Sequence, residues 1–202
     1  MTRNTPTGAA GAGRAGTDGD AAVTYVALWR GINIVRSKRV AMADLRPLLQ
    51  ELGFGQVRTL LNSGNAVFTA HPGSMEDAPA RIQAAVAERL GVSARVILLT
   101  AAELRAACAG NPLYAPDRDP SRLLVAALAD DAARALVQPL LPQDWTPDAL
   151  ALGARVAYMW CPAGYTESRL VPALGKALGD AVTTRTWTTM LKLDALAPAI
   201  SD

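Results

Sequence analysis

The feature that most constrains the fold is an order of apolar segments that occurs twice along the chain. A short β-rich stretch at 23–29 is followed by leucines at helical spacing, by two further short strands and by a second helical stretch. A second series begins at residue 122 and has the same approximate order without evident sequence identity. This repetition predicts an α+β protein with two tandem ferredoxin-like (β-α-β-β-α) domains and antiparallel sheets.

Turn and capping residues give the boundaries of the predicted elements. Asp44 is the expected N-cap of the first helix, which places Pro47 in its first turn, and Ser74 is expected to open the second helix. Thr183 to Trp187 is read as a lead into the last helix. The predicted strands are 23–29, 56–61, 65–69, 95–99, 122–128, 150–152 and 155–160.

Composition also divides the chain into segments. Residues 1–22 are rich in Gly, Ala and Thr and predict a disordered tail. Asn111 to Ser121 contains three prolines and little that could pack, so we place the domain boundary there. The predicted organisation is a first domain at 23–112, a linker at 113–121 and a second domain at 122–202.

Charge and cysteine content exclude several classes of protein. The 20 basic and 18 acidic residues nearly balance, so a protein that coats polyanions is not indicated. Cys108, Cys161 and the single His71 cannot form a structural zinc site, and two buried thiols in a reducing cytoplasm are expected. No apolar run approaches the roughly 20 residues of a membrane span. We therefore expect a cytoplasmic protein without a metal or cofactor.

The predicted topology brings two polar turns together. In a right-handed β-α-β unit whose third strand inserts antiparallel between the first two, the first and second strands run the same way. The turns at 30–33 and 62–65 are therefore expected at the same end of the sheet, where ligands commonly bind.

The residues of these turns are rich in hydrogen-bond donors. Arg30 offers a bidentate fork, and the glycines allow close approach of the backbone. A second candidate cradle for an anion is the predicted start of the last helix, at Thr184 and Arg185. The alternative is that these residues only form turns and caps. The candidate ligand-binding residues are Arg30, Gly31, Asn33, Asn62, Ser63, Gly64, Asn65, Thr184 and Arg185.

Several separated motifs together resemble the bacterial family called domain of unknown function 1697. They are Arg30-Gly31-Ile32-Asn33, Met42-Ala43-Asp44-Leu45-Arg46, Leu52-Gly53-Phe54, Ser63-Gly64-Asn65-Ala66-Val67-Phe68 and Thr183-Thr184-Arg185-Thr186-Trp187. The resemblance covers about 23–197 and implies a cytoplasmic protein with two tandem ferredoxin-like domains, but no reaction. Val35 and Arg36 stand where members usually have glycines.

The leading expectation is a protein that binds a small phosphate- or carboxylate-bearing ligand between the two turns. One alternative is a nucleic-acid-binding module, because sheets of this topology can present bases to aromatic side chains. Another is a hydrolase or transferase that uses Ser63, although no base is recognisable beside it. The sequence does not indicate an oligomeric state.

Overall fold

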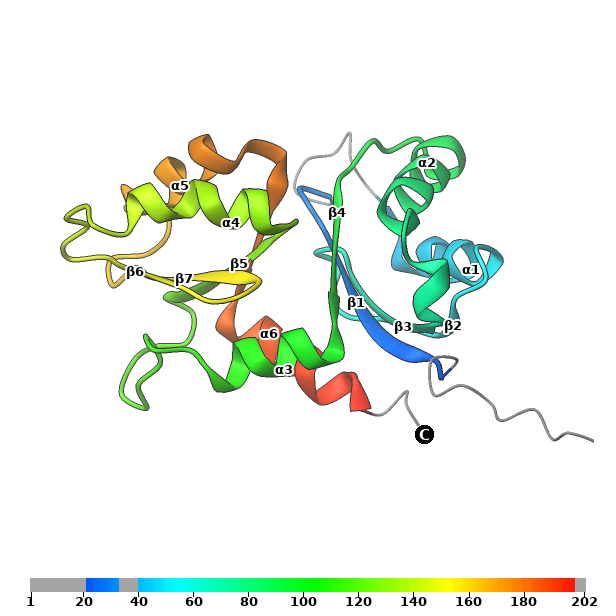
Figure 1. Cartoon of the computed structure of the whole chain (residues 1–202), viewed down its shortest axis with the longest axis horizontal. Coiled ribbons are helices and arrows are strands. Elements are labelled where there is room, and N and C mark those ends of the chain that lie inside the picture. Colours follow the sequence, from blue (N-terminus) through cyan, green and yellow to red (C-terminus); the bar gives the residue numbers. More distant parts are fainter. Residues whose placement is uncertain (1–20, 33–39, 199–202) are drawn as a thin grey trace, which may run out of the picture.

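A computed structural model describes residues 21–32 and 40–198 of the chain (Figure 1). The first half comprises β1 (Val23–Trp29), α1 (Met42–Glu51), β2 (Gly55–Thr59), β3 (Asn65–Ala70), α2 (Ala78–Leu90), β4 (Val96–Thr100) and α3 (Ala101–Ala109). The second half comprises β5 (Leu123–Leu128), α4 (Asp131–Val137), β6 (Ala149–Leu152), β7 (Val156–Trp160), α5 (Leu170–Leu178), β8 (Val182–Thr186) and α6 (Trp187–Leu196). Short 3₁₀ helices lie at Pro72–Ser74, Gln138–Leu140 and Gly179–Ala181.

The described residues form two four-stranded antiparallel sheets, which confirms the α+β class. The strand orders are β2-β3-β1-β4 and β6-β7-β5-β8. Since β3 pairs antiparallel with both β1 and β2, these two strands run in the same direction. The ends of β1 and β2 that lead into the two polar turns therefore lie at the same end of the first sheet, as predicted.

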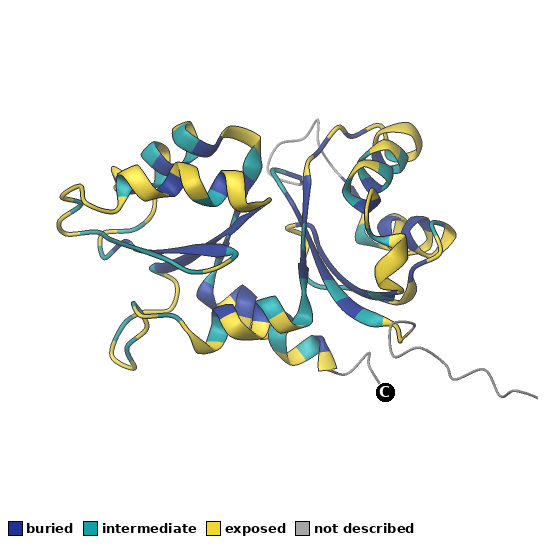
Figure 2. Ribbon diagram, viewed as in Figure 1, coloured by how far each residue is buried: buried dark blue, intermediate teal, exposed yellow. Residues whose placement is uncertain are grey.

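Three apolar clusters hold the layers together (Figure 2). One lies between the first sheet and helices α1 and α2, and another lies between the second sheet and helices α4 and α5. The third, which we call the central cluster, joins the two halves. Its members include Leu28 from β1, Leu104 from α3, Val125 from β5 and Leu193 from α6. Both faces of each sheet are therefore covered.

The starts of two helices differ from the prediction. Helix α1 begins at Met42 with Ala41 as its N-cap, so Asp44 lies in the first turn and Pro47 lies inside the helix. Asp44 still contributes there, because a carboxylate in the first turn interacts favourably with the helix dipole.

Helix α2 begins at Ala78 with Asp77 as its N-cap, not at Ser74. The Ser74 hydroxyl donates to the carbonyl of His71 at 2.7 Å and stabilises the preceding 3₁₀ turn instead.

Strand β8 was absent from the predicted elements. It pairs with β5 over Val182–Thr186, and the side chain of Thr186 then accepts from Thr189 N–H as the N-cap of α6. Val182 and the threonines of β8 are β-branched and suit a strand. The strand was not predicted because Arg185 is a charged residue in a segment that is otherwise typical of a strand. Arg185 can be buried there because groups in the first half accept its hydrogen bonds.

Helix length and composition also bear on the membrane question. None of the helices in residues 21–32 and 40–198 is long and apolar enough to cross a bilayer.

Two leucines of α6 test the role of the central cluster. Leu193 is fully buried in it, whereas Leu191 is 44% exposed. We expect Leu193→Ala to lower the free energy of unfolding by about 2–5 kcal/mol, because it leaves a cavity. Leu191→Ala is the matched control, with an expected change within about 0.5 kcal/mol. Urea denaturation followed by circular dichroism measures both, and equal losses would contradict the assignment of α6 to the cluster.

Candidate functional site

The two polar turns lie against each other. Trp29 N–H donates to the carbonyl of Gly64 at 2.9 Å, and Leu28 pairs with Asn65 across the sheet. Gly64 has a φ of +75°, and a Cβ at this position would overlap the side chain of Ile32. A glycine is therefore required where the two turns make contact.

A buried arginine from the second half joins the two turns. Arg185 is only 9% exposed, and its Nε donates to Asn65 Oδ1 at 2.6 Å. Its Nη2 donates to the carbonyls of Trp29 at 2.7 Å, Gly64 at 3.0 Å and Ser63 at 3.2 Å. Its guanidinium thus connects β8 to both turns of the first half.

The other end of the same guanidinium is bound within β8. Arg185 Nη1 donates to the carbonyl of Thr184 at 2.8 Å and to the hydroxyl of Thr183 at 2.9 Å. All five of its N–H groups are therefore engaged. Burial lowers the pKa of Arg185 to about 10, so the side chain remains charged at neutral pH. The sequence predicted that Arg185 binds a ligand, but its donors are already bonded to protein groups.

Asn65 is committed to the same network. Its side chain is fully buried, and Nδ2 donates to the carbonyl of Leu60 and to the hydroxyl of Ser63, both at 2.9 Å. Since Oδ1 accepts from Arg185, both ends of the amide are used. Asn62 lies exposed at the tip of the turn, and Asn33 lies outside the described residues.

Arg30 contacts the second half but keeps part of its donor capacity. Its Nη1 donates to the carbonyl of Val182 in β8 at 2.7 Å, and its Nε lies 3.4 Å from Asp180 Oδ1. The side chain is 37% exposed. In the opposite direction, Arg155 of the second half donates to the carbonyl of Leu98 in β4 at 3.2 Å. Each half thus supplies an arginine to an edge strand of the other.

Two cavities meet at Gly31. The first has a volume of about 230 Å³ and brings together residues of both turns with the start of α6. It is lined by Gly31, Ile32, Ser63, Thr184, Arg185, Thr186 and Thr189. The predicted residues Gly31, Ser63, Thr184 and Arg185 therefore lie around one cavity, which is rich in hydroxyl groups.

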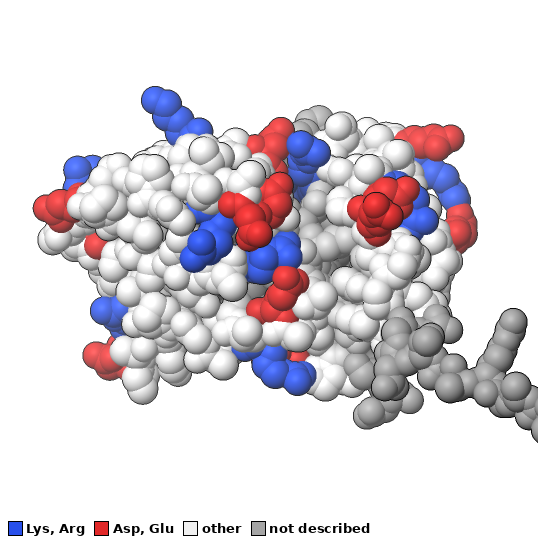
Figure 3. Space-filling view, viewed as in Figure 1, with Lys and Arg blue, Asp and Glu red and all other residues white. Residues whose placement is uncertain are grey.

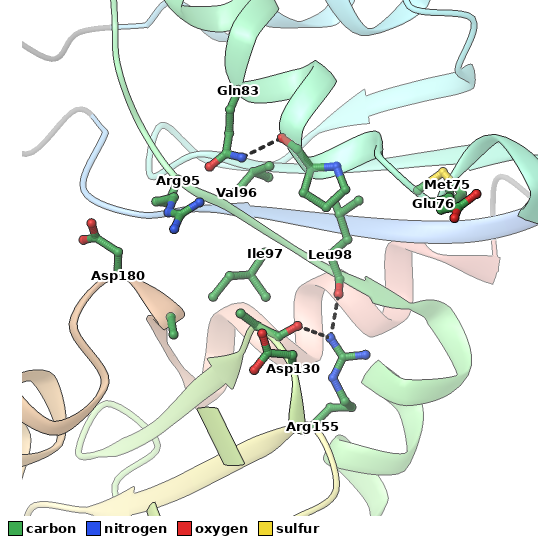
Figure 4. A pocket seen from close by; sticks show the side chains of 13 residues that line it. Met75, Glu76, Gln83, Arg95, Val96, Ile97, Leu98, Asp130, Arg155 and Asp180 are labelled. Atoms are coloured by element: carbon green, nitrogen blue, oxygen red, sulfur yellow. Dashed lines mark hydrogen bonds between the residues drawn. The ribbon is translucent and has the colours of Figure 1, made fainter. Parts of the chain in front are cut away.

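The second cavity has a volume of about 480 Å³ and contains two arginines. It is lined by Arg30, Gly31, Gln83, Ser93, Ala94, Arg95 and Asp180. A third cavity of about 400 Å³ shares Gln83, Arg95 and Asp180 with it and continues between the two halves (Figure 4). In the space-filling view, basic and acidic side chains gather along the line where the halves meet (Figure 3).

Arg95 belongs to this region but is not among the residues that the sequence predicted for the site. It is exposed, lines both the second and the third cavity, and has no side-chain hydrogen bond or ion pair with any residue in the described part of the chain. The sequence placed it only at the start of a predicted strand. Its only signal in the sequence is a basic residue directly before the apolar segment 96–99, at an end of the predicted strand.

Catalytic chemistry finds little support among the described residues. Ser63 accepts from an amide, and no histidine or carboxylate in the described ranges bonds to its hydroxyl. Burial and the charge of Asp194 raise the pKa of Cys108 to about 12, so its thiol stays protonated. Cys108 and Cys161 are free thiols, and Cys108 is only partly buried. No group of three metal-ligating side chains occurs in the ranges that the structure covers.

The aromatic residues of the second sheet serve packing. Tyr158 is 2% exposed, its hydroxyl donates to the carbonyl of Ala107 at 2.9 Å, and burial raises its pKa to about 12. Trp160 stacks under the guanidinium of Arg118, at 4.8 Å from the ring centre. Neither ring lies on an open sheet face.

Comparisons with known proteins agree with this architecture. The family description "Protein of unknown function (DUF1697)" matches residues 23–158, which confirms the resemblance found in the sequence. A solved structure, the conserved bacterial protein SP0830 from Streptococcus pneumoniae, is similar with a TM-score of 0.69. The alignment has 22% identity and covers 88% of this chain and 99% of that chain, and it concerns the fold alone. A comparison with curated proteins found no match.

The network around Arg185 predicts that its fork geometry matters beyond its charge. Lysine keeps the charge but has three donors on one nitrogen, so Arg185→Lys would leave buried acceptors such as Asn65 Oδ1 unpaired. Each unpaired acceptor costs about 1–3 kcal/mol, and we expect a loss of at least about 2 kcal/mol in the free energy of unfolding.

The matched control is Arg58→Lys, because Arg58 is exposed on β2 and has no side-chain partner within the described residues. We expect it to change stability by less than about 0.5 kcal/mol. Guanidinium chloride denaturation measures both variants. If Arg185→Lys is as stable as Arg58→Lys, the guanidinium network does not hold the halves together.

Proposed function

We propose, from the premise that this chain belongs to the DUF1697 family of proteins of unknown function, that it binds a small phosphate- or carboxylate-bearing ligand between its two halves. The observation that carries this proposal is Arg95, an exposed arginine that lines two adjoining cavities and pairs with nothing in the described chain. An arginine fork matches the geometry of phosphate and carboxylate oxygens.

Neighbouring groups support the same chemistry. Arg30 lines the second cavity beside Arg95, and only its Nη1 and Nε have partners in the second half. The hydroxyl of Ser93 and the backbone of Gly31 complete a donor-rich wall. Asp180 lines the same cavity and offsets the charge of Arg30, so Arg95 supplies the unbalanced positive charge there.

The proposed site overlaps the predicted one but has a different centre. Arg95 and Arg30 hold the anionic group, and Gly31 connects this cavity to the smaller one with the hydroxyls of Ser63 and Thr184. Asn65 and Arg185 act as positioning residues, because their polar atoms are bonded to each other and to the turns.

We also infer two tandem ferredoxin-like domains at 23–112 and 122–202, joined by the linker at 113–121. The inserted third strand and the matching strand orders of the two sheets support this inference. A cytoplasmic location is proposed with it, and the two free thiols favour a reducing compartment.

A nucleic-acid-binding role has less support. Single-stranded RNA binds ferredoxin-like modules by stacking bases on an exposed sheet face. In this chain α1 and α2 cover one face of the first sheet, and the central cluster covers the other. The sheet therefore offers no open face for a base.

Ligand titration tests the proposed function. The panel contains inorganic phosphate, a sugar phosphate, a nucleoside monophosphate and a dicarboxylate, measured by isothermal titration calorimetry. We expect at least one to bind, and we expect Arg95→Ala to weaken that binding at least tenfold because a charge-assisted pair is lost.

Arg58→Ala serves as the control for loss of one positive charge, since Arg58 is exposed on β2 and lines none of the cavities described above. Its affinity should stay within about twofold of the parent protein, because a distant exposed charge is largely screened. No binding across the panel, or equal affinity in both alanine variants, would overturn the proposed site.

A further inference from the structure

Strand β4 is an edge strand with an outer side that is partly open. Arg30 N–H donates to the carbonyl of Arg95 at 2.8 Å, so the backbone of Arg95 faces β1. Backbone groups alternate in direction along an antiparallel ladder, which turns those of Val96 and Leu98 away from β1. The bond from Arg155 Nη2 to the carbonyl of Leu98 agrees with this orientation.

Three outward backbone groups remain available on this edge. Among residues 21–32 and 40–198, nothing bonds to the N–H or the carbonyl of Val96 or to the N–H of Leu98. These groups lie beside the cavity of about 400 Å³, whose lining includes the four consecutive residues 95–98 (Figure 4). This volume falls in the range of about 300–1,000 Å³ that is usual for ligand sites.

The charges along this groove differ between its ends. Arg95 and Glu76 line the same cavity and lie towards opposite ends of it in Figure 4. Three other charged side chains line the groove. Asp180 lies 3.4 Å from Arg30, and Arg155 bonds to Glu103 at 2.6 Å. Asp130 caps α4 by accepting from Ala133 N–H and keeps its negative charge. A carboxylate is therefore attracted to the Arg95 end and repelled from the Glu76 end.

We propose that this groove takes a short extended peptide with a free C-terminal carboxylate, which adds to the first sheet at β4. The inference rests on the proposed function, because the carboxylate is the anionic group that Arg95 holds. Arg95 precedes β4, so a peptide that ends there runs antiparallel to the strand. Its backbone exchanges two hydrogen bonds with Val96 and accepts a third from Leu98 N–H.

The position of the open edge between the halves limits what can pair with it. An edge with unpaired N–H and carbonyl groups invites association with other strands. Here the second half walls the edge, with Ala129 and Arg155 in the lining, and leaves room only for a short segment. The backbone hydrogen bonds to Val96 and Leu98 supply affinity, and the ion pair with Arg95 selects a peptide that ends in a free carboxylate.

Nuclear magnetic resonance of the ¹⁵N-labelled full chain tests this proposal with tetra-alanine as the probe. We expect tetra-alanine to shift the amide signals of Val96 and Leu98. Its C-terminal amide should bind at least tenfold more weakly, because the carboxylate that pairs with Arg95 is absent. An analogue with N-methylated backbone amides should lose affinity to a similar degree, because it cannot donate to Val96.

Inorganic phosphate is titrated in parallel to separate the two proposals. If phosphate shifts the Arg95 side-chain signal and tetra-alanine leaves Val96 and Leu98 unchanged, the peptide inference is wrong and the anion site stands. Equal binding of tetra-alanine and its amide would also overturn the peptide inference. If tetra-alanine perturbs no signal in the groove, the peptide inference fails, and the anion site fails with it only when the whole calorimetric panel also shows no binding.

Discussion

The arrangement of the two halves depends on one buried cation. Arg185 lies on β8 of the second half, and its guanidinium binds the carbonyls of Trp29, Ser63 and Gly64 in the first. Neutral carbonyl groups receive this charge, and no acidic side chain in the described ranges forms a salt bridge with it. Because a buried charge is costly unless its hydrogen bonds are satisfied, the carbonyls must stay in place. The two turns and β8 are thereby fixed with respect to one another.

Much of the fold could be predicted because local patterns and burial agree. The short apolar run at 23–29 is typical of a strand buried on both faces, and in β1 Ala27 and Trp29 pack in one cluster while Val26 and Leu28 pack in another. Strand β8 could not be found in this way. Its residue Arg185 is polar by type, and most of the groups that accept hydrogen bonds from its buried guanidinium lie 120 or more positions away.

The candidate site could also be predicted only in part. Topology alone predicted that the turns carrying Gly31 and Ser63 would lie together, and a cavity between them contains both residues. The roles of the polar residues could not be predicted, since residue type does not distinguish a donor that is free from one that is used. Asn65 and Arg185 form a hydrogen bond with each other, whereas Arg95, which belongs to none of the sequence motifs, lines the groove without a side-chain partner in the described residues.

The long separation of Arg185 from its partners also has a consequence for synthesis in the cell. Asn65 Oδ1 gains its donor only after 120 further residues have been added. At the usual rate of about 5–20 residues per second, this takes about 6–24 seconds. During that interval the first half has left the peptidyl-transferase centre without the strand that completes its turns. The face of β1 that packs in the central cluster is covered by α3 of the first half alone until β5, β7 and α6 are added. Nascent chains of this protein thus pass through a stage in which an apolar surface awaits its own C-terminal partner.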